Sequence, residues 1–230
     1  LGSTMPNEAR ERLVALCATH GIALIEDDVY ADLHPGASRL RAQKSWDRSG
    51  HVIYCASLNK SLSPGLRLGW MLGGRWHDSI ETLKMAQSRP KEELQQRVAA
   101  RFLESSAFDR HIRRLHRVLE RQRQEMVALV GETFPAGSAV HNVDAGMLLW
   151  VKLPGGVSSR RLFSAALDQR IRIVPGAIFS SSPYFDAYIR LSCGWPLSRE
   201  RVDAVAKLGQ LCDDLKSGSS AHRSGGPAPA

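Results

Sequence analysis

The chain has 230 residues, of which 43% are hydrophobic and 23% charged, and its formal net charge is +8. This composition is typical of a globular protein that buries a substantial core. No apolar run reaches the roughly 18 residues that a membrane-spanning helix needs, and the first residues lack the basic and then apolar plan of a signal peptide. We therefore expect a cytoplasmic location and no membrane partner.

The cysteines and the positive charge exclude some functions. Cys17, Cys55, Cys193 and Cys212 are far apart and form no C-x-x-C pair, which favours neither a metal site nor a disulfide framework. The charge of +8 could indicate a polyanionic partner. However, the basic residues of 110–123 alternate with acidic and apolar ones, as on a solvated helix face. The charge therefore does not predict direct nucleic-acid binding by these residues.

The first half of the chain is expected to alternate helices and strands. A helix should follow Pro6, with Ser3 or Thr4 as its cap and Gly21 at its end. A short apolar run over 22–25 predicts a buried strand. Further along, the pattern predicts a strand over 52–55, an apolar run over 66–72, and helices over 77–87, 92–104 and 108–130.

After Phe134 the pattern changes to short strands. Strands are expected over 146–154, 171–174 and 187–193, and helices over 159–169 and 198–215. Beyond Ser217 the chain is Gly, Ser, Pro and Ala, too poor in apolar surface to offset the entropy of ordering. Two isolated histidines, His34 in a turn with Pro35-Gly36 and His51, are expected in loops or at the surface.

Lys60 follows the predicted strand over 52–55, among small and hydroxyl residues. Taken alone, such a lysine is a solvated loop residue, because Lys is among the residues least often buried. Ser57 lies three residues before it and Arg67 seven residues after it. A serine hydroxyl and a forked guanidinium can together hold a phosphate. An amine beside a bound phosphate suggests a cofactor with a reactive carbonyl group.

Three consecutive acids, Glu26, Asp27 and Asp28, follow the predicted strand over 22–25. Ligands of open α/β sheets gather at the carboxyl ends of the strands. Without a ligand, three consecutive acids would be unusual at the end of a buried strand, because burying a charge without a partner is costly. Considered alone, Asp27 could equally be a helix cap or a turn residue.

The segment from Ser57 to Trp70, Ser-x-x-Lys60 and then Pro-Gly-x-Arg67-x-Gly-Trp, resembles the cofactor-lysine segment of class I/II aminotransferases, which are fold-type I pyridoxal-phosphate enzymes. The resemblance implies that Lys60 bonds covalently to pyridoxal 5'-phosphate. It also implies that Ser57 and Arg67 hold the phosphate. Asn59 departs from the pattern, since the family usually has a second hydroxyl residue there.

The acids fit the same resemblance. Asp27-x-x-Tyr30 is similar to the family pattern in which the aspartate pairs with the ring nitrogen and the tyrosine reaches the phenolic oxygen of the ring. A carboxylate at that nitrogen keeps it protonated, and the protonated ring is the electron sink of the chemistry. Asp28 is the competing assignment, ranked second because only Asp27 has a tyrosine three residues on.

The later part of the chain resembles the small domain of these enzymes. The matching segments, in order, are Gly146-x-x-x-Trp150, Pro175-Gly176 with Phe179, and Tyr188 to Ser192. The resemblance implies that Arg190 binds the α-carboxylate of the substrate. A bidentate guanidinium would fix that carboxylate in one orientation. The alternative for Arg190 is an internal salt bridge to an acid.

The resemblance implies an α/β protein with the aspartate aminotransferase-like fold of pyridoxal-phosphate-dependent transferases. Residues 1–104 would be the C-terminal part of the cofactor-binding large domain, 105–216 the connecting helix and the small α+β domain, and 217–230 a disordered tail. The family also has an earlier phosphate loop, an aromatic residue stacked on the ring and an Asn-Pro-x-Gly segment. We expect these parts to precede Leu1, in a longer protein of which this chain is a part.

Three segments, 3–6, 108–114 and 190–196, look most like the aminotransferase-like domain of the MocR subgroup of GntR transcription regulators. This resemblance implies a homodimeric domain that senses an amino acid or amine. DNA would be bound only through a separate N-terminal winged helix-turn-helix. The alternative is part of a free-standing transaminase, which moves an amino group from an amino acid to a 2-oxo acid. An unrelated α/β domain is the third possibility.

Overall fold

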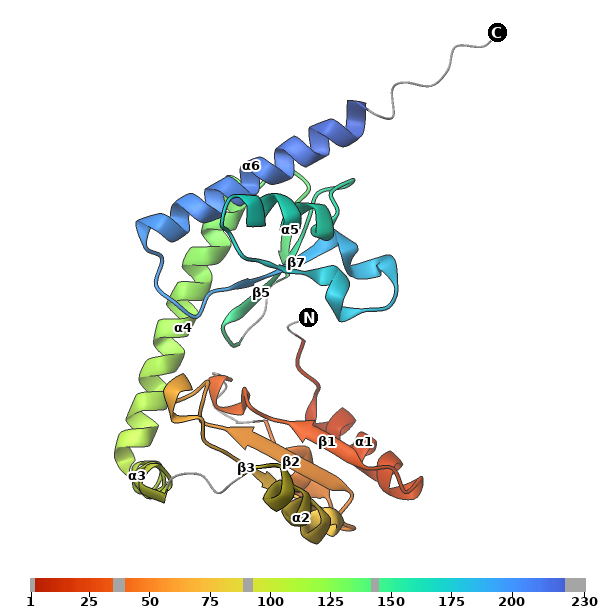
Figure 1. The fold of residues 1–230 in the computed structure, drawn as a ribbon, viewed down its shortest axis with the longest axis vertical. Helices are drawn as coiled ribbons and strands as arrows, with labels where there is room; N and C mark the ends of the chain where they lie inside the picture. The colour runs from red at the N-terminus through yellow and green to blue at the C-terminus, as the bar shows by residue number, and fades with distance from the viewer. Residues whose placement is uncertain (1–2, 35–39, 89–92, 142–144, 222–230) are drawn as a thin grey trace. The chain divides into compact units, whose positions relative to one another are not determined.

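The computed structural model describes residues 3–34, 40–88, 93–141 and 145–221. The chain divides into two compact units, Thr4–Arg117 and the residues from Val118 onward together with Ser3, and Figure 1 labels the α-helices and most of the strands. The division falls inside α4, a helix over Ser106–Thr133. The expected boundary at 104/105 concerns the domains of the family and stays a prediction. The expected turn at Pro35-Gly36 and the tail from 222 lie outside the described residues.

A sheet organises the first unit. Its described residues form three strands in the order β1-β2-β3, with β1 (Leu24–Asp27) parallel to β2 (Val52–Ser57) and β3 (Gly69–Leu72) antiparallel to β2 (Figure 1). Asp27 pairs with Cys55, and Ser57 with Gly69. Because β1 and β2 are parallel, their carboxyl ends lie at the same edge of the sheet.

Helices and a small core complete the first unit. Its helices are α1 (Asn7–Thr19), α2 (His77–Gln87), α3 (Glu93–Leu103), the first part of α4, and the short 3₁₀ helices η1 (Ala31–Leu33), η2 (Gln43–Trp46), η3 (Pro64–Leu66) and η4 (Gly74–Trp76). Leu58 and Leu68, which flank the β2–β3 loop, are buried against Ala99 of α3. The loop that carries Lys60 is therefore anchored on α3.

The first unit corrects several sequence predictions. The residue before α1 is Pro6, and no side chain caps the helix, so neither Ser3 nor Thr4 is the cap. β1 begins two residues later than expected, which places Glu26 and Asp27 inside the strand. His51, expected in a loop or at the surface, lies in the loop before β2 but is only 6% exposed, so the surface alternative is wrong. Helix α2 has the predicted bounds.

The second unit has its own antiparallel sheet. The described strands are β4 (Ala139–His141), β5 (Leu148–Lys152), β6 (Val174–Pro175) and β7 (Tyr188–Ser192), in the order β4-β5-β7-β6. The helices α5 (Ser159–Asp168) and α6 (Arg199–Ala221) and the 3₁₀ helices η5 (Gly176–Phe179) and η6 (Pro183–Ala187) complete it. Side chains of β5, β7, α5 and α6, including Val151, Ile189, Leu162 and Leu208, form its core.

Three elements of the second unit differ from expectation. β4 was not predicted, β6 is shorter and later than the predicted strand over 171–174, and α6 continues to Ala221 instead of ending near Leu215. Each of the four cysteines has a free thiol. In the described part of the chain, none of the helices combines the length and apolar character that crossing a bilayer requires.

Candidate functional site

Lys60 lies in a tight loop directly after β2. The backbone N–H groups of Leu62 and Ser63 donate to the Leu58 carbonyl at 2.9 and 3.1 Å, and the Leu58 N–H donates to the Leu68 carbonyl at 3.0 Å. The Leu58 side chain is 2% exposed. The loop is thus held by its own hydrogen bonds and by one buried leucine, while the Lys60 side chain remains exposed.

The structure brings Lys60 close to Tyr30. The Lys60 amine lies 5.8 Å from the centroid of the Tyr30 ring, within the range of a cation–π contact. Tyr30 follows β1 and Lys60 follows β2, the two parallel strands. The sheet register therefore explains why residues thirty positions apart in sequence meet at one edge.

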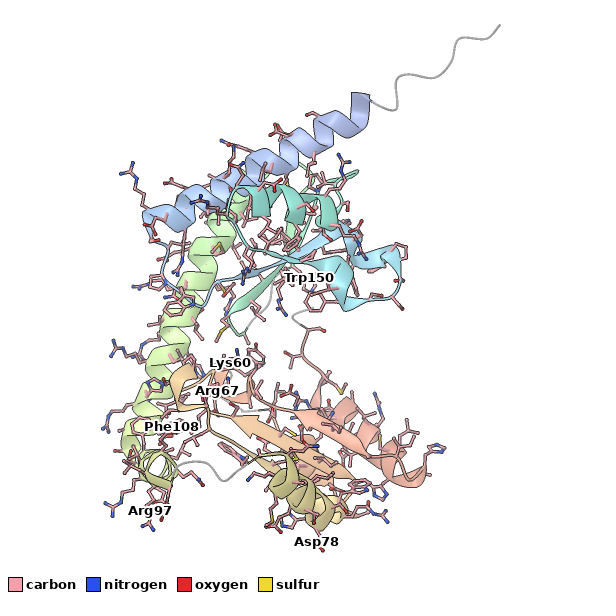
Figure 2. The ribbon with its side chains drawn as sticks, viewed as in Figure 1. Lys60, Arg67, Asp78, Arg97, Phe108 and Trp150 are labelled. Carbon is pink, nitrogen blue, oxygen red and sulfur yellow. The ribbon has the colours of Figure 1, made fainter. Side chains whose placement is uncertain are left out.

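Ser57 and Arg67 lie at the two ends of the same loop, and Figure 2 labels Lys60 and Arg67 there. The Ser57 hydroxyl donates to the Leu68 carbonyl at 3.2 Å and accepts from the Asn59 N–H at 3.1 Å. Arg67 has a left-handed backbone, with φ 51° and ψ 30°. That conformation is uncommon for a residue other than glycine and concentrates at functional sites.

The three consecutive acids, Glu26 and Asp27 in β1 and Asp28 directly after it, differ in their partners. The buried Glu26 carboxylate accepts two backbone N–H groups of η2, at 2.7 and 2.9 Å. The Asp28 carboxylate accepts the Tyr54 hydroxyl at 3.1 Å. Among the described residues, nothing donates a hydrogen bond to the Asp27 carboxylate or forms an ion pair with it. Of the two competing aspartates, Asp27 is thus the one whose carboxylate is available to a ligand.

Cys55 lies beside Asp27, its partner in the strand register. Burial, and secondly the negative charge of Asp27, raise the pKa of the Cys55 thiol. The thiol therefore stays protonated near neutral pH.

Two polar atoms in the residues next to Lys60 are buried and have no hydrogen-bond partner among the residues that the structure describes. They are Oδ1 of Asn59 and Oγ of Ser61, which together flank the lysine in sequence. Leaving a buried polar atom unpaired costs about 1–3 kcal/mol, and such atoms are available to a ligand. Sequence reasoning treated Asn59 only as a departure and did not single out Ser61. Their adjacency to Lys60 was the only signal that could have found them.

Arg190 lies in the second unit, on β7. It pairs in register with Trp150 of β5 and Val174 of β6. Its guanidinium carbon is 4.9 Å from the centroid of the Phe179 ring, and that ring contacts Trp150 edge-on at 5.6 Å. No described acid forms a salt bridge with Arg190, so the predicted alternative of an internal ion pair is not observed.

Comparison with known proteins identifies the family of this arrangement. The family model described as Aminotransferase class I and II matches residues 1–207. In Escherichia coli (strain K12), the uncharacterized HTH-type transcriptional regulator YdcR is 32% identical over 93% of this chain, and the match covers 46% of its own length. The chain thus spans about half the length of the curated relatives that it matches.

Two solved structures resemble the fold. Kynurenine aminotransferase of Pyrococcus horikoshii, in complex with PMP, matches with a TM-score of 0.81 at 26% identity, over 93% of this chain and 53% of its own. LysN, the α-aminoadipate aminotransferase of Thermus thermophilus, complexed with N-(5'-phosphopyridoxyl)-L-leucine, matches with a TM-score of 0.76 at 28% identity, over 92% of this chain and 55% of its own. These matches confirm the predicted aspartate aminotransferase-like fold.

The family and the cofactors in these structures imply pyridoxal phosphate. The described residues fit this group. Lys60 offers an exposed amine for the cofactor carbonyl, the Asp27 carboxylate is available to a cationic ring nitrogen, and the exposed Arg67 guanidinium is available to the phosphate. The unpaired atoms of Asn59 and Ser61 belong to the residues directly before and after the lysine in sequence.

Proposed function

Because the chain belongs to the class I and II aminotransferase family, we propose that it is the pyridoxal-phosphate-binding, effector-sensing and dimerising part of a MocR/GntR-type transcription regulator. The likeness to an HTH-type regulator over 93% of the chain supports the regulator assignment. The main support for the cofactor site is the contact between the Lys60 amine and the Tyr30 ring. The contact lies at the edge of the sheet that also presents the available Asp27 carboxylate.

Each residue of this edge has a distinct task in the proposal. Lys60 would hold the cofactor through its carbonyl carbon, with loss of water, and would move a proton at the α-carbon of the bound amino compound. Asp27 keeps the ring nitrogen protonated, and Tyr30 donates its hydroxyl proton to the phenolic oxygen. Ser57 and Arg67 hold the phosphate. When bound, pyridoxal phosphate supplies an electron sink for the bonds around that α-carbon.

Arg190 is assigned to the carboxylate of an amino acid effector. Its guanidinium stacks near Phe179 and is free of ion pairs with the described acids. Such a group gains a strong charge-assisted pair when a carboxylate arrives. An amine without a carboxylate would not gain it. Relative affinity for an amino acid and its decarboxylated amine therefore measures the part played by Arg190.

The proposal extends to the whole protein. DNA is bound through an N-terminal winged helix-turn-helix that lies outside residues 1–230, the regulator is a homodimer, and it acts in the cytoplasm. The basic residues of 110–123 in α4 take no part in DNA binding, because they alternate with acidic and apolar residues as on a solvated helix face.

A second function, part of a free-standing transaminase, is favoured by the likeness to two solved aminotransferases. The residues needed for amino transfer are the same as those proposed for sensing. Turnover distinguishes the two functions, because a transaminase releases a 2-oxo acid and a sensor retains the amino compound.

The test is the absorbance spectrum of the full-length protein with pyridoxal phosphate. The wild-type protein and Lys84→Ala, a change at an exposed lysine of α2, should both show the visible band of a covalently bound cofactor. Lys60→Ala should not. If Lys60→Ala keeps the band, the site assignment fails. Amino acids that alter the band without release of a 2-oxo acid favour the sensor, and release of the 2-oxo acid favours the transaminase.

A further inference from the structure

Helix α4 contacts both loops of the candidate cofactor site through histidines. Nε2 of His111 is 2.7 Å from the backbone carbonyl oxygen of Ser61, the residue after Lys60. Nε2 of His116 is 2.6 Å from the carbonyl oxygen of Asp32, two residues after Tyr30. All of these residues belong to the first compact unit. One helix is therefore hydrogen-bonded to the loop of the cofactor lysine and to the loop of the tyrosine.

The acceptor atoms fix the chemistry of these contacts. A carbonyl oxygen can only accept, so Nε2 of each histidine must carry a proton. Such a proton is present in one neutral tautomer and in the imidazolium form. The two hydrogen bonds thus require an N–H donor at Nε2, which neither phenylalanine nor leucine can supply.

The carbonyl groups of Ser61 and Asp32 belong to the two loops that carry Lys60 and Tyr30, so hydrogen bonds to them affect the position of both residues. In the Lys60 loop, the Leu58 carbonyl closes the turn by accepting from Leu62 and Ser63, which leaves the Ser61 carbonyl for His111. After Tyr30, the Leu33 N–H closes the η1 turn on the Tyr30 carbonyl at 2.9 Å.

Packing supports the same role. The His111 ring contacts Phe102 of α3 edge-on at 6.2 Å between centroids, and the Lys60 loop rests on Ala99 and Leu103 of the same helix. His111 is thus fixed by an aromatic contact on α3 while it donates to the loop. A phenylalanine at position 111 would keep the ring contact and lose only the donor.

We propose that His111 and His116 are positioning residues. They tie the loops that carry Lys60 and Tyr30 to α4, and so fix the position of the Lys60 amine relative to the Tyr30 ring. The functional consequence rests on the proposed function: a cofactor bonded to Lys60 and touching Tyr30 stabilises both loops and, through the two histidines, α4. Because α4 continues to Thr133, occupancy of the site is communicated to a helix that extends beyond the first unit.

The first test needs no variant. In ¹⁵N NMR spectra of the wild-type full-length protein without cofactor, both histidines should carry a slowly exchanging proton at Nε2. A neutral His111 or His116 with its proton at Nδ1 overturns the proposal for that residue. This result does not depend on cofactor binding, and it holds even if a variant fails to fold.

The second test compares matched variants by hydrogen exchange, again without cofactor. His111→Phe should speed amide exchange in residues 60–63 roughly fivefold, the effect of losing one net hydrogen bond, and His116→Phe should do the same in 31–34. His111→Gln and His116→Gln, whose amide N–H lies near the position of Nε2, should stay within about twofold of wild type. Arg113→Gln, at an exposed position of α4, is the control.

The third test adds pyridoxal phosphate. Each Phe variant should bind it roughly fivefold more weakly, and the cofactor should slow exchange in 108–117 of the wild type but not of the double Phe variant. Equal exchange in Phe variants and wild type, or equal effects of Phe and Gln, overturns the positioning role. A wild-type protein that shows the expected exchange but binds no pyridoxal phosphate contradicts the proposed function and leaves the loop contacts established.

Discussion

Arg67 combines a left-handed backbone, φ 51°, with a guanidinium that the proposal assigns to the cofactor phosphate. The conformation costs about 1–2 kcal/mol for a residue with a Cβ, and glycine would avoid that cost but add chain entropy to the unfolded state. The two effects nearly cancel, so the stability of the protein without cofactor should change little in a glycine variant.

The prediction for Arg67→Gly is a free energy of unfolding within about 1 kcal/mol of wild type, measured by urea denaturation without cofactor. Affinity for pyridoxal phosphate should fall at least roughly tenfold, since hydrogen bonds to charged groups contribute about 1.5–3 kcal/mol. Arg170 also has a positive φ, 59°, but lies in the second unit. Arg170→Gly is therefore the matched control. Equal affinities in both variants would remove Arg67 from the phosphate site.

Asp47 makes a pH-dependent contribution to stability, away from the candidate site. Burial alone would raise the pKa of Asp47, but hydrogen bonds from the Lys44 ammonium and the backbone N–H groups of Val52 and His51 lower it from 3.8 to about 2. Because the folded pKa lies below the unfolded one, this stabilisation is complete above pH 3.8 and is lost as the pH falls toward 2.

We predict that Asp47 contributes on the order of 2 kcal/mol at neutral pH. In Asp47→Asn, urea unfolding should show a lower free energy of unfolding at pH 7 and a shallower decline between pH 4 and 2. Asp168→Asn, at an exposed position of the second unit, is the control. Parallel stability curves for wild type and Asp47→Asn would contradict the assignment.

At the scale of single residues, the sequence led to role predictions only for residues that belong to a motif. It gave no guide to residues whose position depends on distant contacts. Asp27 was preferred to Asp28 because of Tyr30, and its assignment to the ring nitrogen stays a prediction. The structure shows that the Asp28 carboxylate accepts the Tyr54 hydroxyl. His51 has no motif and was expected in a loop or at the surface; it lies in the loop before β2 but is buried. Its Nε2 accepts from Arg75, and its Nδ1 donates to Ser49 at 2.7 Å. The Arg75 partner lies 24 positions away, which local sequence patterns do not reveal.

Among the elements, the β2–β3 loop depends on a small core. Leu58, Leu68 and Ala99 are the buried members of the cluster beneath it. Leu58→Ala would leave a cavity between the loop and α3, and such truncations cost about 2–5 kcal/mol. We predict a loss of that size in the free energy of urea unfolding, together with faster amide exchange around Lys60. Leu94→Ala on α3, where Leu94 is 74% exposed, should cost less than about 0.5 kcal/mol. Equal losses would show that Leu58 does not anchor the loop.

Elements were predictable where their own periodicity determines them. Helices α2 and α5 were placed to within one residue, because each follows a helical spacing with clear ends. β6 was misplaced because only Val174 and Pro175 pair with β7. It lies at the edge of its sheet, where a proline is tolerated. A strand this short is defined by its neighbour, not by its own residues.

Across the whole molecule, the motifs predicted the family and its two successive blocks, and the family match and structural likeness confirm the fold. The family's domain boundary at 104/105 stays a prediction, and it is distinct from the division into compact units. That division falls between Arg117 and Val118, in the interior of α4. The helical spacing of apolar residues in α4 continues across this point. The sequence of the helix therefore does not show which residues pack in the first unit and which in the second.

The covalent bond between Lys60 and the cofactor is the central claim, and chemical mapping tests it most directly. Full-length protein is loaded with pyridoxal phosphate, reduced with borohydride to make the bond permanent, digested, and analysed by mass spectrometry. The phosphopyridoxyl mass should lie on the peptide that contains Lys60, and addition of a bound amino acid before reduction should remove it from that peptide. A stoichiometric label on another lysine, or no label on Lys60, would contradict the account.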